Sequence, residues 1–267
     1  MTRRPFTALA LLFVALLSAC VVPPPQPANG NAKDRITASD ESDGSKRARV
    51  RLELATEYFS RGQMPTAPDQ VKLAIAADPN FGEAFNLRGL IYASLGDDRL
   101  AEESFRRALM LNNRDADTMQ NFGWYLCQHK RYGEANALFN QALAVPQYRD
   151  SARTLLTQGV CQAFAGQVQE AERTLLRSYE LDPSSPSTAV NLSELLYRRG
   201  DFERARFYIR RVNSVTEVAS SQTLWLGARI ENKLGNFAEA QTLGNQLRTR
   251  FPDSRESSAF DRGLFDE

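Results

Sequence analysis

Hydrophobic residues recur along most of the chain at intervals of three and four positions, which predicts a series of amphipathic helices. The clearest example is the stretch 116–148, where two such patterns flank a polar turn at His129–Arg131. Small residues, Gly123, Ala135 and Ala142, lie among the large apolar ones at helical spacing. We therefore expect this stretch to form a hairpin of two packed helices.

The same design recurs along the chain with a nearly constant period. A marker alanine occupies the same place in each unit, and subtraction of successive positions gives intervals of 34, 34, 36, 34 and 35 residues: Ala67, Ala101, Ala135, Ala171, Ala205 and Ala240. A helix-turn-helix unit repeated about every 34 residues is typical of the tetratricopeptide repeat. We therefore predict an all-α fold, a superhelical solenoid of about six such repeats.

Three other positions keep step with the marker alanine. A glycine separates the two helices of most repeats, with Lys130 in its place in the third: Gly62, Gly96, Gly166, Gly200 and Gly235. A small residue lies midway along each first helix: Ala55, Gly89, Gly123, Gly159, Ser193 and Ala228. A large apolar residue follows each alanine by four positions, except at Gly244: Val71, Phe105, Phe139, Leu175 and Ile209. Small residues allow close approach of helices and bulky ones fill the spaces, so neighbouring repeats stabilise one another.

The repeats are predicted over residues 47–254. The first is interrupted by Pro65 and Pro68, and the sixth departs from the pattern at Gly244, as expected of terminal repeats. The predicted boundaries are 48–81, 82–115, 116–151, 152–185, 186–220 and 221–254. Residues 255–267 are expected to form either a short capping helix, with Phe260 against Leu264, or a frayed tail.

The first 46 residues differ from the repeats. Residues 1–19 have a basic start and an apolar run too short to span a membrane, which indicates a signal peptide. The ending Leu17–Cys20 resembles a bacterial lipobox, in which Cys20 is acylated; the alternative is an ordinary secretory signal with an incidental cysteine. The residue after the cysteine, Val21, is not the aspartate that tends to retain such lipoproteins in the inner membrane. We therefore expect the protein to be anchored at the periplasmic face of the outer membrane. Residues 20–46 are rich in proline and small polar residues, which predicts a disordered tether.

Charge and candidate chemistry narrow the function. The formal charge of the chain is +1, and removal of Arg3 and Arg4 with the signal peptide leaves about −1. The sequence therefore lacks the excess of positive charge that is typical of nucleic-acid-binding proteins. His129 is the single histidine, and no second histidine lies at ligand spacing, so we expect no metal site. The sequence has neither a G-x-S-x-G motif nor a glycine-rich phosphate loop. We expect a binding protein without cofactors rather than an enzyme.

A stack of such repeats presents a groove lined by first helices. Positions five, nine and twelve of these helices tend to face it, and nine of the residues there are our candidate partner-binding residues: Asn86, Leu90, Gln120, Trp124, Leu156, Val160, Val190, Tyr197 and Trp225. The middle of the groove is apolar, which suits an amphipathic helix or an extended apolar segment of a partner. The alternative is that Trp124 and Leu90 are buried between adjacent helices.

Two cysteines, Cys127 and Cys161, lie on the first helices of consecutive repeats. In an oxidising compartment they either form a disulfide, which requires α-carbons within about 7 Å, or remain two buried thiols. A disulfide between them would join the third repeat to the fourth.

The central segment resembles a known family. The residues that carry the resemblance are N-F-G-W-Y-L-C at 121–127, Arg131-Tyr132, Glu134-Ala135, Pro146 with Tyr148, and Gly159-Val160-Cys161. With these residues, the lipobox and the six repeats, the sequence resembles the PilF/PilW family of type IV pilus biogenesis lipoproteins. The resemblance implies a pilotin in the outer membrane, which binds subunits of the pilus secretin and promotes their localisation and multimerisation.

The resemblance leaves other functions to be considered. Residues Phe251–Ser254 faintly resemble the longer repeats of the tetratricopeptide lipoprotein of outer-membrane barrel assembly, and a cell-wall-associated adaptor is a related alternative. The period near 34 and the cysteine-bearing motif count against both. We expect a monomer that is anchored to the outer membrane by acyl chains on Cys20.

Overall fold

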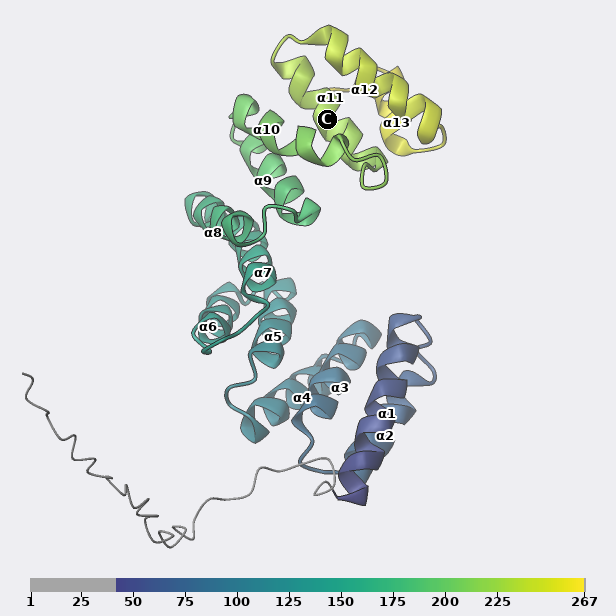
Figure 1. Cartoon of the computed structure of the whole chain (residues 1–267), viewed down its shortest axis with the longest axis vertical. Helices are drawn as coiled ribbons and strands as arrows, with labels where there is room; N and C mark the ends of the chain where they lie inside the picture. Colours follow the sequence, from purple (N-terminus) through teal and green to yellow (C-terminus); the bar gives the residue numbers. More distant parts are fainter. Residues whose placement is uncertain (1–41, 267) are drawn as a thin grey trace, which may run out of the picture. The chain divides into compact units, whose positions relative to one another are not determined.

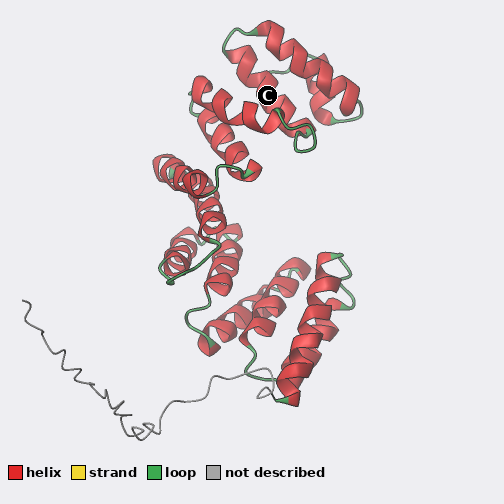
Figure 2. Cartoon of the chain, viewed as in Figure 1, coloured by secondary structure: helices red, strands yellow, loops and turns green. Residues whose placement is uncertain are grey.

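The computed structural model describes residues 42–266, and within this range it contains thirteen α-helices and no strand (Figures 1 and 2). Twelve of the helices form six packed pairs, one pair to a repeat, and a short helix follows them. The pairs are α1 (Asp43–Ser60) with α2 (Ala67–Ala77), α3 (Gly82–Leu95) with α4 (Asp98–Leu111), α5 (Ala116–Gln128) with α6 (Tyr132–Leu143), α7 (Ser151–Phe164) with α8 (Val168–Leu181), α9 (Pro186–Arg198) with α10 (Phe202–Asn213), and α11 (Ser221–Lys233) with α12 (Phe237–Arg250), before α13 (Arg255–Asp261).

The prediction of a six-repeat tetratricopeptide solenoid is confirmed. One boundary differs, because α1 begins at Asp43 and residues 43–46, assigned to the tether, are helical. The cause is local: the Ser42 side chain accepts a hydrogen bond from the Ser45 N–H and caps the helix. The predicted signal peptide, Cys20 and the tether as far as residue 41 lie outside the described residues.

Small and large residues meet inside each pair as the period predicts. A methyl group added at Gly89 would lie 2.6 Å from the Phe105 ring, and one at Gly123 would lie 2.8 Å from the Phe139 ring. Both rings are fully buried. Since real Cβ atoms do not approach other atoms so closely, these two glycines are what allows the aromatic side chains to pack between the helices.

The two terminal repeats depart from the pattern for identifiable reasons. Pro68 occupies the first turn of α2, where a missing N–H breaks no helical hydrogen bond. At the other end, Gly244 leaves a space that the Phe260 ring of α13 fills, because a Cβ there would lie 1.9 Å from that ring. Phe260 contacts Trp225 and Phe265, and α13 ends at Asp261, before the expected partner Leu264.

A left-handed residue follows the end of each first helix and turns the chain into the second helix. Glycine occupies this position in five of the six repeats, for example Gly96 with φ of 75°. Lys130 takes it in the third repeat with φ of 61°, an unfavourable conformation for a side chain with a Cβ. The Lys130 N–H still donates a hydrogen bond to the Cys127 carbonyl, and the Arg131 N–H donates one to the Leu126 carbonyl.

The first helices of neighbouring repeats pack on one another, from α1 on α3 to α9 on α11. Within residues 42–266 no second helix packs on the second helix of the next repeat. The first helices therefore form the inner side of the stack, and we call their shared surface the first-helix face. No helix in the described part of the chain is both long and apolar enough to cross a membrane.

Candidate partner-binding groove

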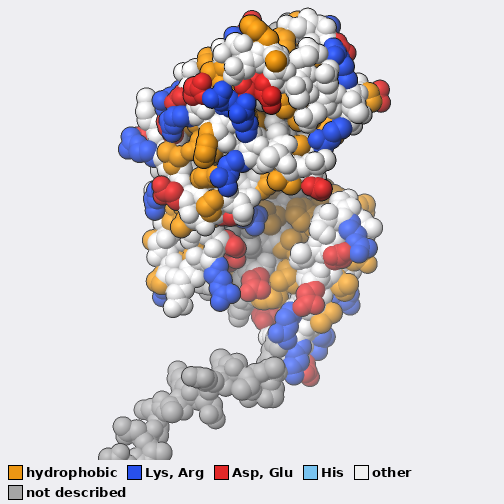
Figure 3. Space-filling model, turned by 45° about the horizontal axis from the view of Figure 1, so that its top comes forward, with side chains coloured by type: hydrophobic (Ala, Val, Ile, Leu, Met, Phe, Trp, Pro, Cys, Tyr) orange, Lys and Arg blue, Asp and Glu red, His pale blue; other side chains and the backbone are white. Residues whose placement is uncertain are grey.

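Two hollows lie side by side on the first-helix face and share Trp124 as a wall. One, of about 300 Å³, has Leu90 and Ala93 of α3 in its lining, together with Phe59 of α1. The other, of about 290 Å³, is lined by residues of α5, α7 and α9, including Leu156 and Val160. Figure 3 shows hydrophobic side chains gathered in a hollowed part of the surface. Trp124 is half-buried, so part of its ring remains accessible.

Several side chains that line or border the hollows were not among the predicted groove residues. Phe164, 60% exposed, lies with its ring centre 6.4 Å from that of Trp124 and extends the apolar surface. Arg153 and Asn191 add a cation and an amide to the second hollow. The helical period offered a signal for two of them, because Phe164 lies four residues after Val160 and Arg153 three before Leu156.

Other predicted groove residues have different surroundings. Asn86 is half-buried and its side-chain oxygen accepts a hydrogen bond of 3.2 Å from the Asn121 amide, which joins α3 to α5. Gln120 lines the second hollow but is only 6% exposed. Val190 lines neither hollow and packs against the core between the fourth and fifth repeats. Leu90, Trp124, Leu156 and Val160 are therefore the predicted residues that the structure brings together.

Tyr197 and Trp225 lie on the first-helix face, but the chain's own end lies on them. The Phe265 ring packs on Trp225 with ring centres 5.2 Å apart. The Phe265 carbonyl accepts hydrogen bonds from Tyr197 Oη at 3.5 Å and from Arg229 Nε at 3.2 Å. Both are predicted groove residues, and in this structure an intramolecular segment covers them. The repeat period could not reveal this contact, because the segment follows the last repeat.

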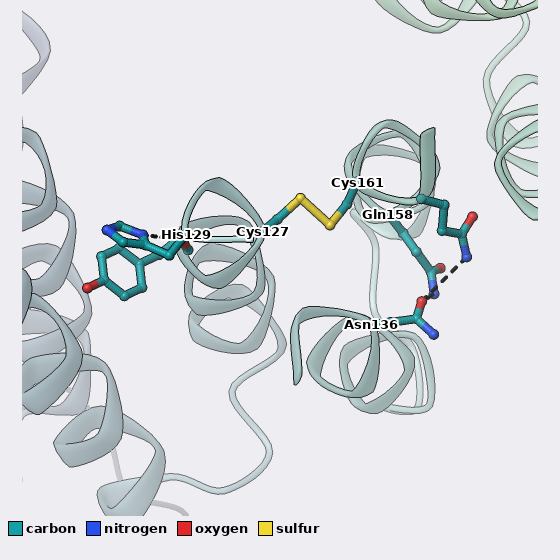
Figure 4. Close-up of a disulfide and its surroundings, with 7 residues drawn as sticks. Cys127, His129, Asn136, Gln158 and Cys161 are labelled. Carbon is teal, nitrogen blue, oxygen red and sulfur yellow. Dashed lines mark hydrogen bonds between the residues drawn. A yellow bond between two sulfur atoms is a disulfide. The ribbon is translucent and has the colours of Figure 1, made fainter. Parts of the chain in front are cut away.

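A disulfide joins Cys127 of α5 to Cys161 of α7, with α-carbons 5.8 Å apart (Figure 4). Both cysteines are buried, at 2% and 3% exposure. The adjacent residue Val160 lines the second hollow, and Trp124 lies one turn before Cys127. The covalent link therefore holds together the two helices that form opposite walls of this hollow.

An amide network supports the same helix from its other side. Gln158 Nε2 donates to Asn136 Oδ1 at 2.6 Å (Figure 4). It also donates to Asn140 Oδ1 at 2.9 Å, and the two bonds link α7 to α6. Gln158 is 5% exposed, so these hydrogen bonds satisfy a buried amide. The disulfide and the amides together determine where α7 lies relative to the third repeat.

The single histidine, His129, contacts groups of its own helix and of the preceding repeat. His129 Nε2 lies 2.9 Å from Asp98 Oδ1 and His129 Nδ1 lies 2.8 Å from the Tyr125 carbonyl, so both ring nitrogens have protein partners. The Tyr125 hydroxyl also donates to Asp98, and burial, followed by the Asp98 charge, raises the pKa of Tyr125 to about 12. These contacts tie the third repeat to the second. Among residues 42–266 no group of three or more potential metal-ligating His, Cys, Asp or Glu side chains occurs.

An ion pair between the same repeats involves Arg131. Its guanidinium donates to Glu102 at 2.6 Å and to Glu134 at 2.7 Å. The hydrogen bond from Arg131 is the main cause that lowers the pKa of Glu102, and the two carboxylates raise the pKa of Arg131. Glu102 thus remains charged and paired at neutral pH.

The geometry can be compared with known proteins. Models of the tetratricopeptide repeat match residues 82–115 and 121–186. The type IV pilus assembly protein PilF of Pseudomonas aeruginosa is 25% identical over 253 residues, which are 95% of this chain and 96% of PilF. PilW, a widely conserved type IV pilus biogenesis factor with a known crystal structure, is 32% identical in sequence to this chain. The two structures match with a TM-score of 0.74, and the match covers 80% of this chain and 97% of the PilW chain. The chain belongs to the PilF/PilW family.

A solved structure of PilF from Pseudomonas aeruginosa supports the fold, with a TM-score of 0.71, 24% identity and coverage of 83% of this chain and all of that chain. As a member of the PilF/PilW family, the chain is a tetratricopeptide-repeat protein of type IV pilus biogenesis. The resemblance found in the sequence is thereby confirmed.

The motif at 121–127, which carries the resemblance to the PilF/PilW family, has an identified structural role at five of its seven positions. Asn121 bonds to α3, Gly123 receives a ring from α6, and Trp124 separates the two hollows. Tyr125 contacts Asp98 of the preceding repeat, and Cys127 forms the disulfide. The motif is therefore where the third repeat is joined to both of its neighbours.

Proposed function

We propose that this chain is a pilotin, an outer-membrane lipoprotein that binds subunits of the pilus secretin and promotes their localisation and multimerisation. Acylation at Cys20 supplies the membrane affinity in this proposal, and the first-helix face holds secretin segments at the periplasmic side of the bilayer. Membership in the PilF/PilW family and the lipobox-like ending Leu17–Cys20 support it. A single acyl chain gives only marginal membrane binding, so the proposal requires more than one acyl chain on Cys20.

The observation that carries the proposal is Trp124 between two hollows on the first-helix face. Each hollow is large enough for an apolar side chain, and two adjacent ones suit consecutive anchors of an amphipathic or extended segment. Full burial of one large apolar side chain contributes about 1.5–3 kcal/mol, and tryptophan is enriched among residues that dominate binding. Arg153 and Asn191 at the second hollow can bond polar groups of the bound segment.

The action is binding rather than catalysis in this proposal. The hollows are lined mainly by apolar, amide and hydroxyl side chains. The disulfide between Cys127 and Cys161 preorganises α5 and α7, so that little ordering cost is incurred when the partner binds.

The test is a Trp124→Ala variant in cells that lack the native gene, with the detergent-resistant secretin multimer followed by gel and surface pili counted. We expect loss of multimer and pili, because removal of a central anchor weakens affinity by about tenfold to a hundredfold. Phe237→Ala is the matched control, since Phe237 is 68% exposed on α12, away from the first-helix face. The melting temperature of both purified variants is measured to check that they remain folded.

Two further outcomes separate the parts of the proposal. Cys20→Ala should leave secretin binding in solution intact but prevent assembly at the outer membrane, and unchanged assembly would refute the anchor. If deletion of the gene depletes outer-membrane barrel proteins in general and leaves the secretin multimer intact, the barrel-assembly alternative is correct and the pilotin proposal is wrong.

A further inference from the structure

The end of the chain does more than cover the last repeat. Helix α13 covers the end of the stack, with Phe260 packed on Gly244 of α12. Gly263, with φ of 70°, then reverses the chain, and residues 263–266, which we call the C-terminal segment, run onto the first-helix face. There they contact α11 and also reach Tyr197 of α9, in the preceding repeat.

The contacts of the C-terminal segment are those of a bound peptide. The Phe265 ring packs against Trp225 and Phe260, with ring centres 5.2 Å and 5.8 Å away. Its main-chain carbonyl accepts from Arg229 Nε, and the Asp266 carboxylate pairs with Lys233. One aromatic side chain, one backbone carbonyl and one carboxylate are thus recognised in order along α11.

The receiving residues lie on the same face of the repeats as Trp124. Arg229 follows the small residue Ala228 in the sixth repeat, as Trp124 follows Gly123 in the third. The Arg229 guanidinium lies 4.6 Å from the centre of the Tyr197 ring, a cation–π contact that orients it toward the bound carbonyl. The site therefore combines an aromatic platform with two cations, Arg229 and Lys233.

We propose that the first-helix face of the fifth and sixth repeats is a second peptide-binding site, and that the C-terminal segment occupies it until a partner displaces it. The partner is an extended protein segment with an aromatic residue followed directly by Asp or Glu, the chemistry that Phe265 and Asp266 supply here. The proposal is independent of secretin binding at Trp124, because it involves different repeats and different side chains.

The test uses a fluorescein-labelled peptide with the sequence of residues 262–267, RGLFDE, and fluorescence anisotropy with the full chain. A tethered segment acts at an effective concentration of about 1 mM, which exceeds a short-peptide Kd of about 100 μM roughly tenfold. The unmodified chain should therefore bind the peptide weakly. The double variant Phe265→Ala/Asp266→Ala should bind it about tenfold more tightly, because its own segment no longer competes.

Two controls make the result specific to this site. In the double-variant background, Arg229→Ala should abolish the gain, whereas Arg173→Ala, which removes a 74% exposed cation from α8, should retain it. A peptide with Phe265→Ala should bind neither chain. If the double variant is poorly folded, Asp266→Asn serves instead, since this side chain is 81% exposed, and a gain of a few-fold is expected.

Equal peptide affinity of the unmodified chain and a folded tail variant would overturn the proposal. So would a variant that melts at a lower temperature without binding peptide, because the C-terminal segment would then be part of the cap alone. Neither result would bear on secretin assembly, which is measured without the peptide.

Discussion

Reduction of the disulfide between Cys127 and Cys161 should destabilise the centre of the solenoid without unfolding its ends. The bond closes a loop with a sequence separation of 34 residues. The chain-entropy relation for such a loop gives about 13 cal/mol/K of entropy removed from the unfolded state, which corresponds to about 4 kcal/mol at 25 °C. Since each repeat contacts only its neighbours, the loss should be concentrated in the third and fourth repeats.

Urea unfolding followed by circular dichroism, with and without dithiothreitol, measures the difference in one and the same chain. Hydrogen exchange then locates it, and amides of α5 and α7 should lose protection while those of α11 and α12 keep it. The Cys127→Ala/Cys161→Ala variant is the control, because its urea midpoint should not respond to reductant. An oxidised and a reduced chain with the same midpoint, or a uniform loss of protection along the chain, would refute the reasoning.

Three further predictions follow from packing, backbone conformation and charge. Gly123→Ala should lower the free energy of unfolding by about 1–3 kcal/mol, because its Cβ would lie 2.8 Å from a buried ring. Gly133→Ala, whose Cβ would meet nothing within 4 Å, should raise it by up to about 1 kcal/mol. Equal urea midpoints for the two variants would contradict this prediction. Lys130→Gly should raise the free energy of unfolding by about 1 kcal/mol by relieving a φ of 61°, and an unchanged melting temperature would argue against the strain. The pKa of Glu102 is lowered mainly by its hydrogen bond from Arg131, so its contribution to stability is complete above the ordinary value of 4.5 and is lost as the pH falls through the lower folded pKa. Arg131→Met should remove that contribution, and the urea midpoints of the two chains should converge as the pH is lowered from 7 to 3; a constant difference would exclude the pairing as its source.

Much of the fold was predictable because the relevant contacts recur at a fixed spacing. Gly89 and Phe105, or Gly123 and Phe139, lie 16 residues apart in the sequence, and the same pairing returns about every 34 residues. Each repeat buries its apolar residues only against its own helices and those of its neighbours. A short-range rule therefore predicts helices, pairing and stacking, and it also placed Trp124 on the first-helix face.

The rest depended on contacts that the period does not contain. The sequence by itself determined the repeats, the motif at 121–127 and the candidate first-helix face. Only the tertiary structure decided that Phe265 covers Trp225, that Phe260 fills the space left by Gly244, and that the two cysteines lie within bonding distance. The physical reason is that helical periodicity specifies which side of a helix is apolar, whereas the identity of what covers that side depends on where the chain goes next.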